Sequence, residues 1–168
     1  MIQVAPAVAG DRLDRFLARI FPGYSRARLQ KLIDEEAVTV NKNEQVVLQG
    51  YQFFNDRIAD SAQWRPLFTD DPVWRTPGGP FEPQCNGLDA ILEYYARLGQ
   101  LSGGTFKVQP EVVVSDEDHV IVQDRMTASR EGKALDMQTV IVFEMTHHRA
   151  ATVTEYVPEP AKWEAFWA

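Results

Sequence analysis

The sequence has little cysteine and little histidine. Its 168 residues contain one cysteine, Cys85, and three histidines. A single cysteine excludes an internal disulfide framework, and Cys85 has no obvious basic partner that would make it a nucleophile. His147 and His148 are adjacent, so their side chains diverge on a strand or turn, and no third ligand stands at a suitable spacing. We therefore predict no metal site.

Long apolar runs are also missing. Met1 is followed by no stretch typical of a signal peptide, and no run reaches the roughly 20 residues of a membrane span. The sequence shows neither a glycine-rich phosphate loop nor an ordered Ser/His/Asp set for nucleophilic catalysis. We predict a soluble, cytoplasmic protein that does not bind a membrane and needs no cofactor.

Positive charge is scarce and unevenly distributed. The chain has a net charge of −7, but residues 1–43 hold seven Lys or Arg against five Asp or Glu, which gives +2, and the remainder carries −9. An acidic body repels phosphate, so a contact with nucleic acid is expected only within the first 43 residues. The length suits one full core with a small appendage. We predict two parts, residues 1–43 and 44–168.

The first part shows a short pattern of helices and strands. Residues 2–8 are predicted as an edge strand, residues 10–20 as a helix with apolar residues at helical spacing, and residues 37–41 as a strand. Ser25 is the predicted N-cap of a second helix. One flank of that helix carries three basic residues: Arg26, Arg28 and Lys31.

The order of these residues resembles the RNA-binding module of bacterial large-subunit-type pseudouridine synthases. The matching pieces are residues 10–14, 24–33 and 38–41. The resemblance implies that Arg26, Arg28 and Lys31 contact RNA phosphates, weakly and in a salt-sensitive way. It ends after Asn41, and neither the closing strands of that module nor a catalytic pseudouridine synthase domain follows. The alternative interpretation of the three basic residues is a solvated helix face.

The second part is predicted to contain helices first and strands afterwards. A long helix is expected to begin with Asn43 as its N-cap and to carry Tyr51 on its apolar stripe, which extends to Ile58. A shorter helix is expected over residues 61–68. The remaining predictions are a short strand within 68–77, a loop over 78–83, a helix over 88–101, and strands over 105–114, 119–129, 134–145 and 152–157.

This order favours an α+β fold in which helices cover one face of a curved antiparallel sheet. Several pieces of the second part resemble the nuclear transport factor 2-like superfamily, in its SnoaL-like and ketosteroid-isomerase-like branch. They are residues 50–55, 67–74, Gly87, 115–120, 154–156 and 163–168. The resemblance implies a cone-shaped sheet wrapped on three helices, a pocket for a small hydrophobic ligand, and a homodimer.

The ketosteroid isomerases of that superfamily use a tyrosine and two acids. Along this chain the tyrosine position falls on Tyr51, the position of the general base on Thr76, and the position of the protonated acid on Ile141. Neither acid is present, so steroid isomerisation by that mechanism is not expected.

Alternation along the strands offers a different acid. If Ile141 faces the cavity, so do three neighbours at even spacing: Met137, Thr139 and Phe143. The preceding strand then turns Asp124 inward, among Val122, Met126 and Ala128. Burial raises the pKa of a carboxyl group, so Asp124 is a candidate general acid or base. The alternative is a structural aspartate paired with a nearby hydroxyl.

We expect Tyr51 to donate a hydrogen bond to a substrate oxygen and Thr76 to guide the substrate. Aromatic side chains at positions 74, 94, 95 and 156 are predicted to form a wall, although buried aromatics are often plain core. The predicted ligand contacts are Trp74, Thr76, Tyr95, Met126, Met137, Thr139, Ile141 and Tyr156. The predicted function is small-molecule binding, with an isomerase, cyclase or lyase reaction; the alternative is a non-catalytic dimerising module with an RNA-binding segment.

Overall fold

The computed structural model describes residues 18, 23, 25–34 and 42–168. The chain divides into two units, Met1–Val40 and Asn41–Ala168. The strands predicted over 2–8 and 37–41 and the helix predicted over 10–20 lie outside the described residues, apart from position 18.

In the first unit, helix α2 spans Arg26–Asp34. The Oγ atom of Ser25 accepts a hydrogen bond from the backbone N–H of Arg28 at 3.3 Å, so the predicted N-cap is confirmed. Leu29 is buried, whereas the basic residues Arg26, Arg28 and Lys31 have exposed side chains.

The second unit begins with helix α3, Lys42–Asn55, which buries Tyr51. The predicted N-cap at Asn43 is wrong, because Asn43 is the second helical residue and is buried. Its Nδ2 atom donates to the backbone oxygen of Glu117 at 2.9 Å, and its Oδ1 atom lies 2.8 Å from Nδ1 of His148. Asn43 therefore joins the helix to two turns of the sheet. Ile58, predicted on the helical stripe, follows the end of α3.

Two further helical segments match the predictions closely. Helix α4 spans Ser61–Trp64 and continues as the 3-10 helix η2, Arg65–Leu67. Pro66 lies in η2, where its missing N–H is tolerated. Helix α5 spans Leu88–Leu101 and ends before Ser102, as predicted.

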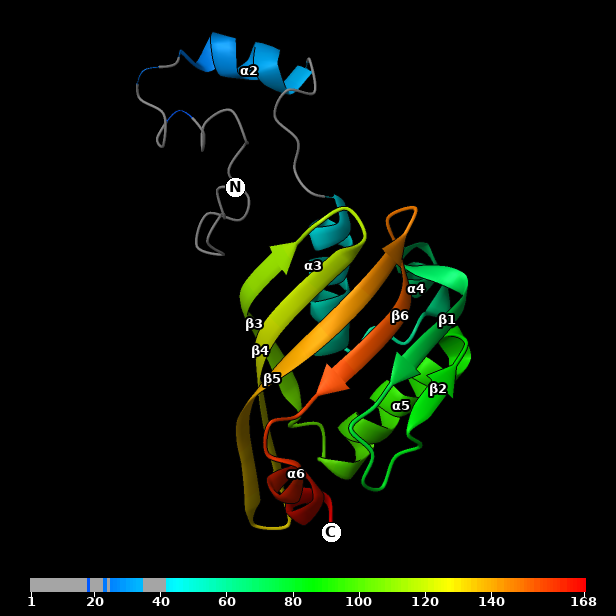
Figure 1. The fold of residues 1–168 in the computed structure, drawn as a ribbon. Helices are drawn as coiled ribbons and strands as arrows, with labels where there is room; N and C mark the ends of the chain where they lie inside the picture. The colour runs from blue at the N-terminus through cyan, green and yellow to red at the C-terminus, as the bar shows by residue number, and fades with distance from the viewer. Residues whose placement is uncertain (1–17, 19–22, 24, 35–41) are drawn as a thin grey trace. The chain divides into compact units, whose positions relative to one another are not determined.

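Six strands form one sheet in the order β2-β1-β6-β5-β4-β3 (Figure 1). In Figure 1, helices α3 and α5 lie behind the sheet and leave the opposite face of β4 to β6 uncovered. The strands are β1 Phe68–Arg75, β2 Gln84–Asn86, β3 Lys107–Ser115, β4 His119–Arg130, β5 Lys133–Thr146 and β6 Arg149–Tyr156.

The sheet differs from the prediction in two respects. β1 pairs with β6 in parallel, whereas the predicted sheet was antiparallel throughout. The short strand β2 was not predicted; in it, Cys85 pairs with Trp74 of β1. Three residues are too few for strand periodicity to be detected in a sequence.

The last helix, α6 at Pro160–Trp167, was also not predicted. It lies at one end of the sheet, near the start of β5 (Figure 1). Trp163 is fully buried, and its Nε1 atom donates to the backbone oxygen of Gly78 at 3.1 Å. The side chains of α6 pack against Phe81 and Phe106, so this end of the sheet is filled with aromatic rings.

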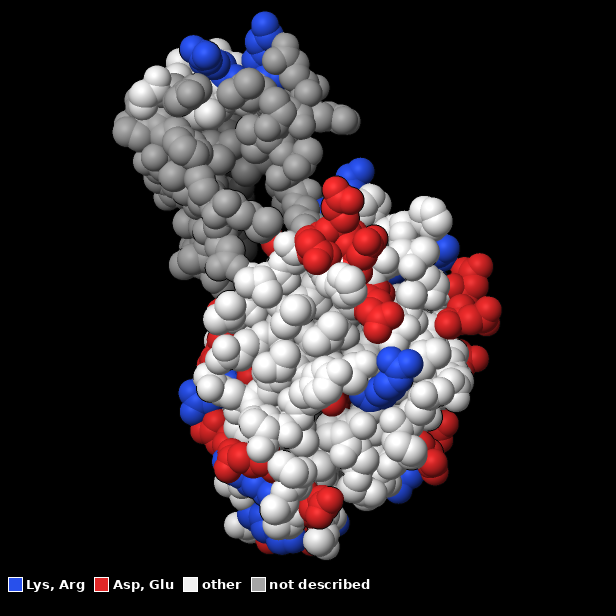
Figure 2. All heavy atoms as spheres, viewed as in Figure 1, with Lys and Arg blue, Asp and Glu red and all other residues white. Residues whose placement is uncertain are grey.

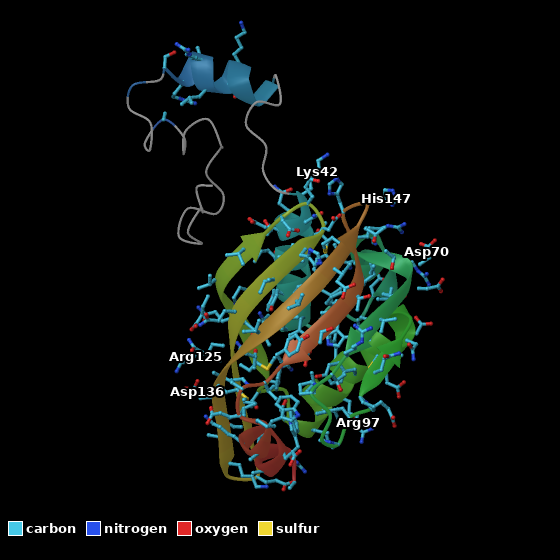
Figure 3. The ribbon with its side chains drawn as sticks, in the orientation of Figure 1. Lys42, Asp70, Arg97, Arg125, Asp136 and His147 are labelled. Atoms are coloured by element: carbon cyan, nitrogen blue, oxygen red, sulfur yellow. The ribbon has the colours of Figure 1, made fainter. Side chains whose placement is uncertain are left out.

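The alternation predicted for the two central strands is confirmed. The inward positions of β4 and β5 are buried: Val122, Asp124, Met126, Ala128, Met137, Thr139, Ile141 and Phe143. Arg125 and Asp136 lie on the other face, where Nε of Arg125 is 2.7 Å from Oδ1 of Asp136; both are labelled in Figure 3. The inward row therefore places Asp124 in the space between the sheet and α3.

Candidate functional site

A cavity of about 50 Å³ lies between the sheet and the helices. Its walls come from α3, α4, α5 and five of the strands, and they consist mostly of apolar and aromatic side chains. Ligand pockets commonly measure about 300–1,000 Å³, so this cavity accommodates only a small group. Among its described lining residues, Glu155 is the one with an ionisable carboxyl group.

Asp124 and Tyr51 meet at this site, as the sequence predicted. Asp124 is 0% exposed, and its Oδ2 atom accepts a hydrogen bond from the hydroxyl of Tyr51 at 2.6 Å. Its Oδ1 atom accepts a hydrogen bond from the hydroxyl of Thr139, its partner across β4 and β5. Tyr51 lines the cavity, but Asp124 does not.

The geometry changes the role predicted for Tyr51. Its single hydroxyl proton is directed to Asp124, so the lone pairs of the phenolic oxygen are available to accept a hydrogen bond. Burial and the charge of Asp124 raise the pKa of Tyr51 well above its ordinary value, which keeps the phenol protonated. Tyr51 therefore serves as an acceptor toward the cavity and as a donor toward Asp124.

Asp124 has no cationic partner among the described residues. Burial raises the pKa of its carboxyl group, while the hydrogen bonds from Thr139 and Tyr51 act in the opposite direction. Both a catalytic and a structural aspartate would have such hydroxyl partners. The partners of Asp124 therefore do not distinguish the two roles. The second carboxyl group of the site is better evidence for a chemical function.

Glu155, on β6, was not among the site residues predicted from the sequence. Glu155 is 8% exposed; its Oε1 atom accepts a hydrogen bond from Nε1 of Trp74 at 2.8 Å, and its Oε2 atom accepts one from the hydroxyl of Tyr94 at 3.0 Å. Burial raises the pKa of Glu155 to about 8, against the effect of these two hydrogen bonds, and the charge of Asp124 adds to the increase. Glu155 thus carries a proton at neutral pH.

The pairing of β5 with β6 explains why Glu155 faces the cavity. Ile141 pairs with Glu155 across β5 and β6, and paired residues point to the same face of a sheet. Met145 pairs with Ala150 and Glu144 with Thr152, so Ala151 has no partner in the ladder. This bulge reverses which residues of β6 face inward, and a sequence alone does not reveal it.

Four of the predicted ligand contacts line the cavity: Trp74, Tyr95, Met126 and Ile141. Met137 and Thr139 are buried but do not line it. Tyr156 was predicted to line it and instead points outward, with 56% of its surface exposed, because it neighbours the inward-facing Glu155. Tyr94, from the predicted aromatic wall, lines the cavity and holds Glu155.

Thr76 does not reach the cavity either. It follows the last residue of β1, and its Oγ1 atom donates to the backbone oxygen of Glu82 at 2.6 Å and accepts from the N–H of Gly78 at 3.2 Å. Thr76 therefore fixes the loop after β1, and its predicted role as a guide for the substrate is wrong.

Two other features of the described residues concern binding. Within them, no group of three or more His, Cys, Asp and Glu side chains has the arrangement of a metal site. None of the helices in that part of the chain combines the length and the apolarity that a membrane crossing requires. Cys85 is buried on β2, and burial raises the pKa of its thiol.

Comparison with known protein families gives two matches. A family model described as "SnoaL-like domain" matches residues 47–153, and one described as "S4 domain" matches residues 11–45. The second match covers the segment that resembled the RNA-binding module of pseudouridine synthases. The two matched ranges do not overlap and together run from residue 11 to residue 153.

The individual relatives are of two kinds. An uncharacterized protein from Mycobacterium tuberculosis is 34% identical over 115 residues, which are 65% of this chain and 85% of that protein. Ribosomal large subunit pseudouridine synthase D from Yersinia pestis is 41% identical over 116 residues, which are 56% of this chain but 36% of that protein. The chain therefore spans about a third of that enzyme.

The fold has solved counterparts. The structure of Bal32a from a soil-derived mobile gene cassette is similar with a TM-score of 0.70 and 34% sequence identity. The similarity covers 76% of this chain and 97% of Bal32a. The fold of the larger part of this chain therefore has a solved counterpart.

Proposed function

The chain belongs to the SnoaL-like domain family over residues 47–153, and we propose that its second unit binds a small hydrophobic molecule and transfers protons to and from it. The single observation that carries this proposal is Glu155. A carboxyl group that lines an apolar cavity with a pKa of about 8 is protonated at neutral pH and can donate a proton. The reactions that need such a group are isomerisations, cyclisations and eliminations without a cofactor.

The proposed mechanism uses two proton paths. The phenolic oxygen of Tyr51 takes an acidic C–H proton from the ligand while its own proton passes to Oδ2 of Asp124. Glu155 donates its proton, or a strong hydrogen bond, to the ligand oxygen on which negative charge develops. The proton count balances, because Asp124 gains the proton that the ligand loses and Glu155 supplies the one that the enol oxygen receives.

Exchange of carbon-bound hydrogen tests this mechanism without a known substrate. Cyclohexanone in D₂O is followed by NMR with the wild-type chain and with Tyr51→Phe, Asp124→Asn and Glu155→Gln. We expect the wild type to accelerate exchange and each variant to lower the rate by about 10²-fold or more. Asp136→Asn, a carboxylate lost from the outer face of the same sheet, is the matched control. Wild-type exchange equal to that of buffer would refute proton transfer.

The first unit supports a second candidate function, RNA binding. The S4 domain match covers residues 11–45, and Arg26, Arg28 and Lys31 have exposed side chains on α2. We propose that these three residues contact RNA phosphates. Because three contacts neutralise few phosphates, binding is weak and depends on salt.

The outer face of the sheet supports a homodimer. Five apolar or aromatic side chains on this face are 37% to 56% exposed: Val112, Val114, Ile121, Val140 and Tyr156. Figure 2 shows few charged side chains over this face, with most of the acidic ones toward its edges. A sheet face with several exposed apolar side chains and few charges is typical of an interface, and we propose that a second copy of the chain covers it.

A further inference from the structure

A second pocket lies on the helical side of the same unit. It has a volume of about 550 Å³ and is formed by the end of α3, Trp64, one side of α5 and the turn before β3. This volume falls within the range of pockets that hold small organic ligands. We call it the outer pocket, and the 50 Å³ cavity the inner cavity.

The two spaces share one wall. Four aromatic residues line both of them: Phe54, Trp64, Tyr95 and Phe106. The ring of Phe54 contacts that of Tyr95 edge to face, with centroids 5.1 Å apart, and lies 6.0 Å from that of Phe106. One layer of side chains therefore separates the outer pocket from the inner cavity with its carboxyl group.

Arg57 is the one charged residue among the described residues that line the outer pocket. Its guanidinium group forms no hydrogen bond or ion pair with any described residue. A Cβ atom at Gly104 would lie 2.5 Å from Nη1 of Arg57, so the missing side chain at Gly104 leaves the space that the guanidinium occupies. An arginine without a partner beside an apolar pocket is complementary to a carboxylate.

The backbone at Arg57 ends helix α3. Arg57 has a φ of 55° and follows the end of α3. Its N–H donates to the oxygen of Phe54 at 3.1 Å, and the N–H of Ile58 donates to the oxygen of Phe53 at 3.0 Å. These bonds define a Schellman motif, in which glycine is the favoured residue at the left-handed position. An arginine is less favourable there than glycine, so a substitution to glycine can be made without loss of the turn.

We propose that the outer pocket binds the carboxylate of an aromatic carboxylic acid through Arg57, with the apolar body of the acid against Phe54, Tyr95 and Phe106. This inference rests on the proposed function, because it names the class of molecule that the site takes. A ligand held in this way has its ring against the wall of the inner cavity.

Two matched probes test the charge preference. Binding of 1-naphthaleneacetic acid and of its neutral isostere 1-naphthaleneacetamide to the full chain is measured by isothermal titration calorimetry at pH 7. We expect the wild type to bind the acid about tenfold more tightly than the amide, as a guanidinium–carboxylate contact provides. Arg57→Gln should bind the two probes equally. Arg97→Gln, which removes a cation from α5 outside the pocket (labelled in Figure 3), should keep the preference.

Arg57→Gly separates binding from folding. A cation at the end of a helix also interacts favourably with the helix dipole, so loss of binding by itself does not exclude a structural role. Glycine suits the left-handed position, so the melting temperature should equal or exceed that of the wild type while the preference for the acid disappears. The inference would be overturned if Arg57→Gly kept the preference for the acid. It would also be overturned if the wild type bound the two probes equally, or bound neither.

The inference and the proposed function fail in different ways. If the Arg57 variants keep the preference while Glu155→Gln still abolishes hydrogen exchange, the inference alone is wrong. If the wild type prefers the acid through Arg57 but exchanges no carbon-bound hydrogen, proton transfer is wrong and the pocket remains a binding site.

Discussion

The phenolic oxygen of Tyr51 lies 2.6 Å from Oδ2 of Asp124, and both residues are buried. One residue comes from helix α3 and the other from the middle of β4, so folding brings together a donor and an acceptor separated by 73 positions in the chain. The pair has no nearby cation among the described residues to replace either partner. The free energy of the interaction between Tyr51 and Asp124 can therefore be measured by substitution of the two residues.

Stability should reveal the coupling between Tyr51 and Asp124. Tyr51→Phe removes one donor from a buried carboxyl group, which costs about 1–3 kcal/mol of unfolding free energy. Asp124→Asn replaces the acceptor by a group of the same shape. The double variant should be more stable than the sum of the two changes implies, by about 0.5–3 kcal/mol in urea unfolding at pH 7. Additive effects within about 0.3 kcal/mol would contradict a direct interaction.

The pH dependence of stability should identify Glu155. Its pKa rises from 4.5 to about 8 on folding, so between these values the native state binds more protons than the unfolded state. Stability is therefore fully present below about pH 4.5 and is lost as the pH rises toward about 8, by about 1.4 kcal/mol per pH unit at most.

Urea unfolding of the wild type and of Glu155→Gln from pH 5 to pH 9 measures this effect. The curve of the variant should be flatter, because glutamine does not titrate. The pKa of Asp124 is also raised and its charge acts on Glu155, so the same comparison in the Asp124→Asn background separates the two carboxyl groups. Parallel curves would show that Glu155 is ionised in the folded protein at neutral pH.

The proposed dimer should respond to charge on the outer face of the sheet. Ile121→Asp places a carboxylate in the centre of that face, and a two-fold interface would bury it twice without a partner. Sedimentation equilibrium should show a dimer for the wild type. The dissociation constant of the dimer should be at least 100-fold higher for the variant. Leu48→Asp changes an equally exposed apolar residue on α3 and is the control. A monomeric wild type, or a dimer indifferent to Ile121→Asp, would rule out this interface.

RNA binding by the first unit should depend on salt. Arg26→Ala combined with Arg28→Ala removes two cations from α2, so the slope of log affinity against log salt should decrease by about 1–2. A ribosomal RNA hairpin in a filter-binding assay provides the measurement. Arg65→Ala with Lys107→Ala removes the same charge from the second unit and should leave the slope unchanged. If the wild type retains no RNA at low salt, the proposal fails.

The periodic spacing of apolar residues in the sequence was enough to predict much of the fold. The spacing of apolar residues located α5, and a strict alternation over β4 and β5 identified the inward row that contains Asp124. Tyr51 followed from the helical stripe of α3. These features are local, because one residue and its neighbours along the chain decide which way a side chain points.

Contacts between segments far apart in the chain determined the features that the sequence did not predict. The unpaired Ala151 turned Glu155 inward and Tyr156 outward, and the parallel pairing of β1 with β6 brought Trp74 to Glu155. α6 forms where its aromatic residues find Phe81 and Phe106, and Arg57 lies beside Gly104 only because the two loops meet. A sequence records which side chains can be buried, but strand register and loop packing depend on partners far along the chain, and these determine which acid faces the cavity.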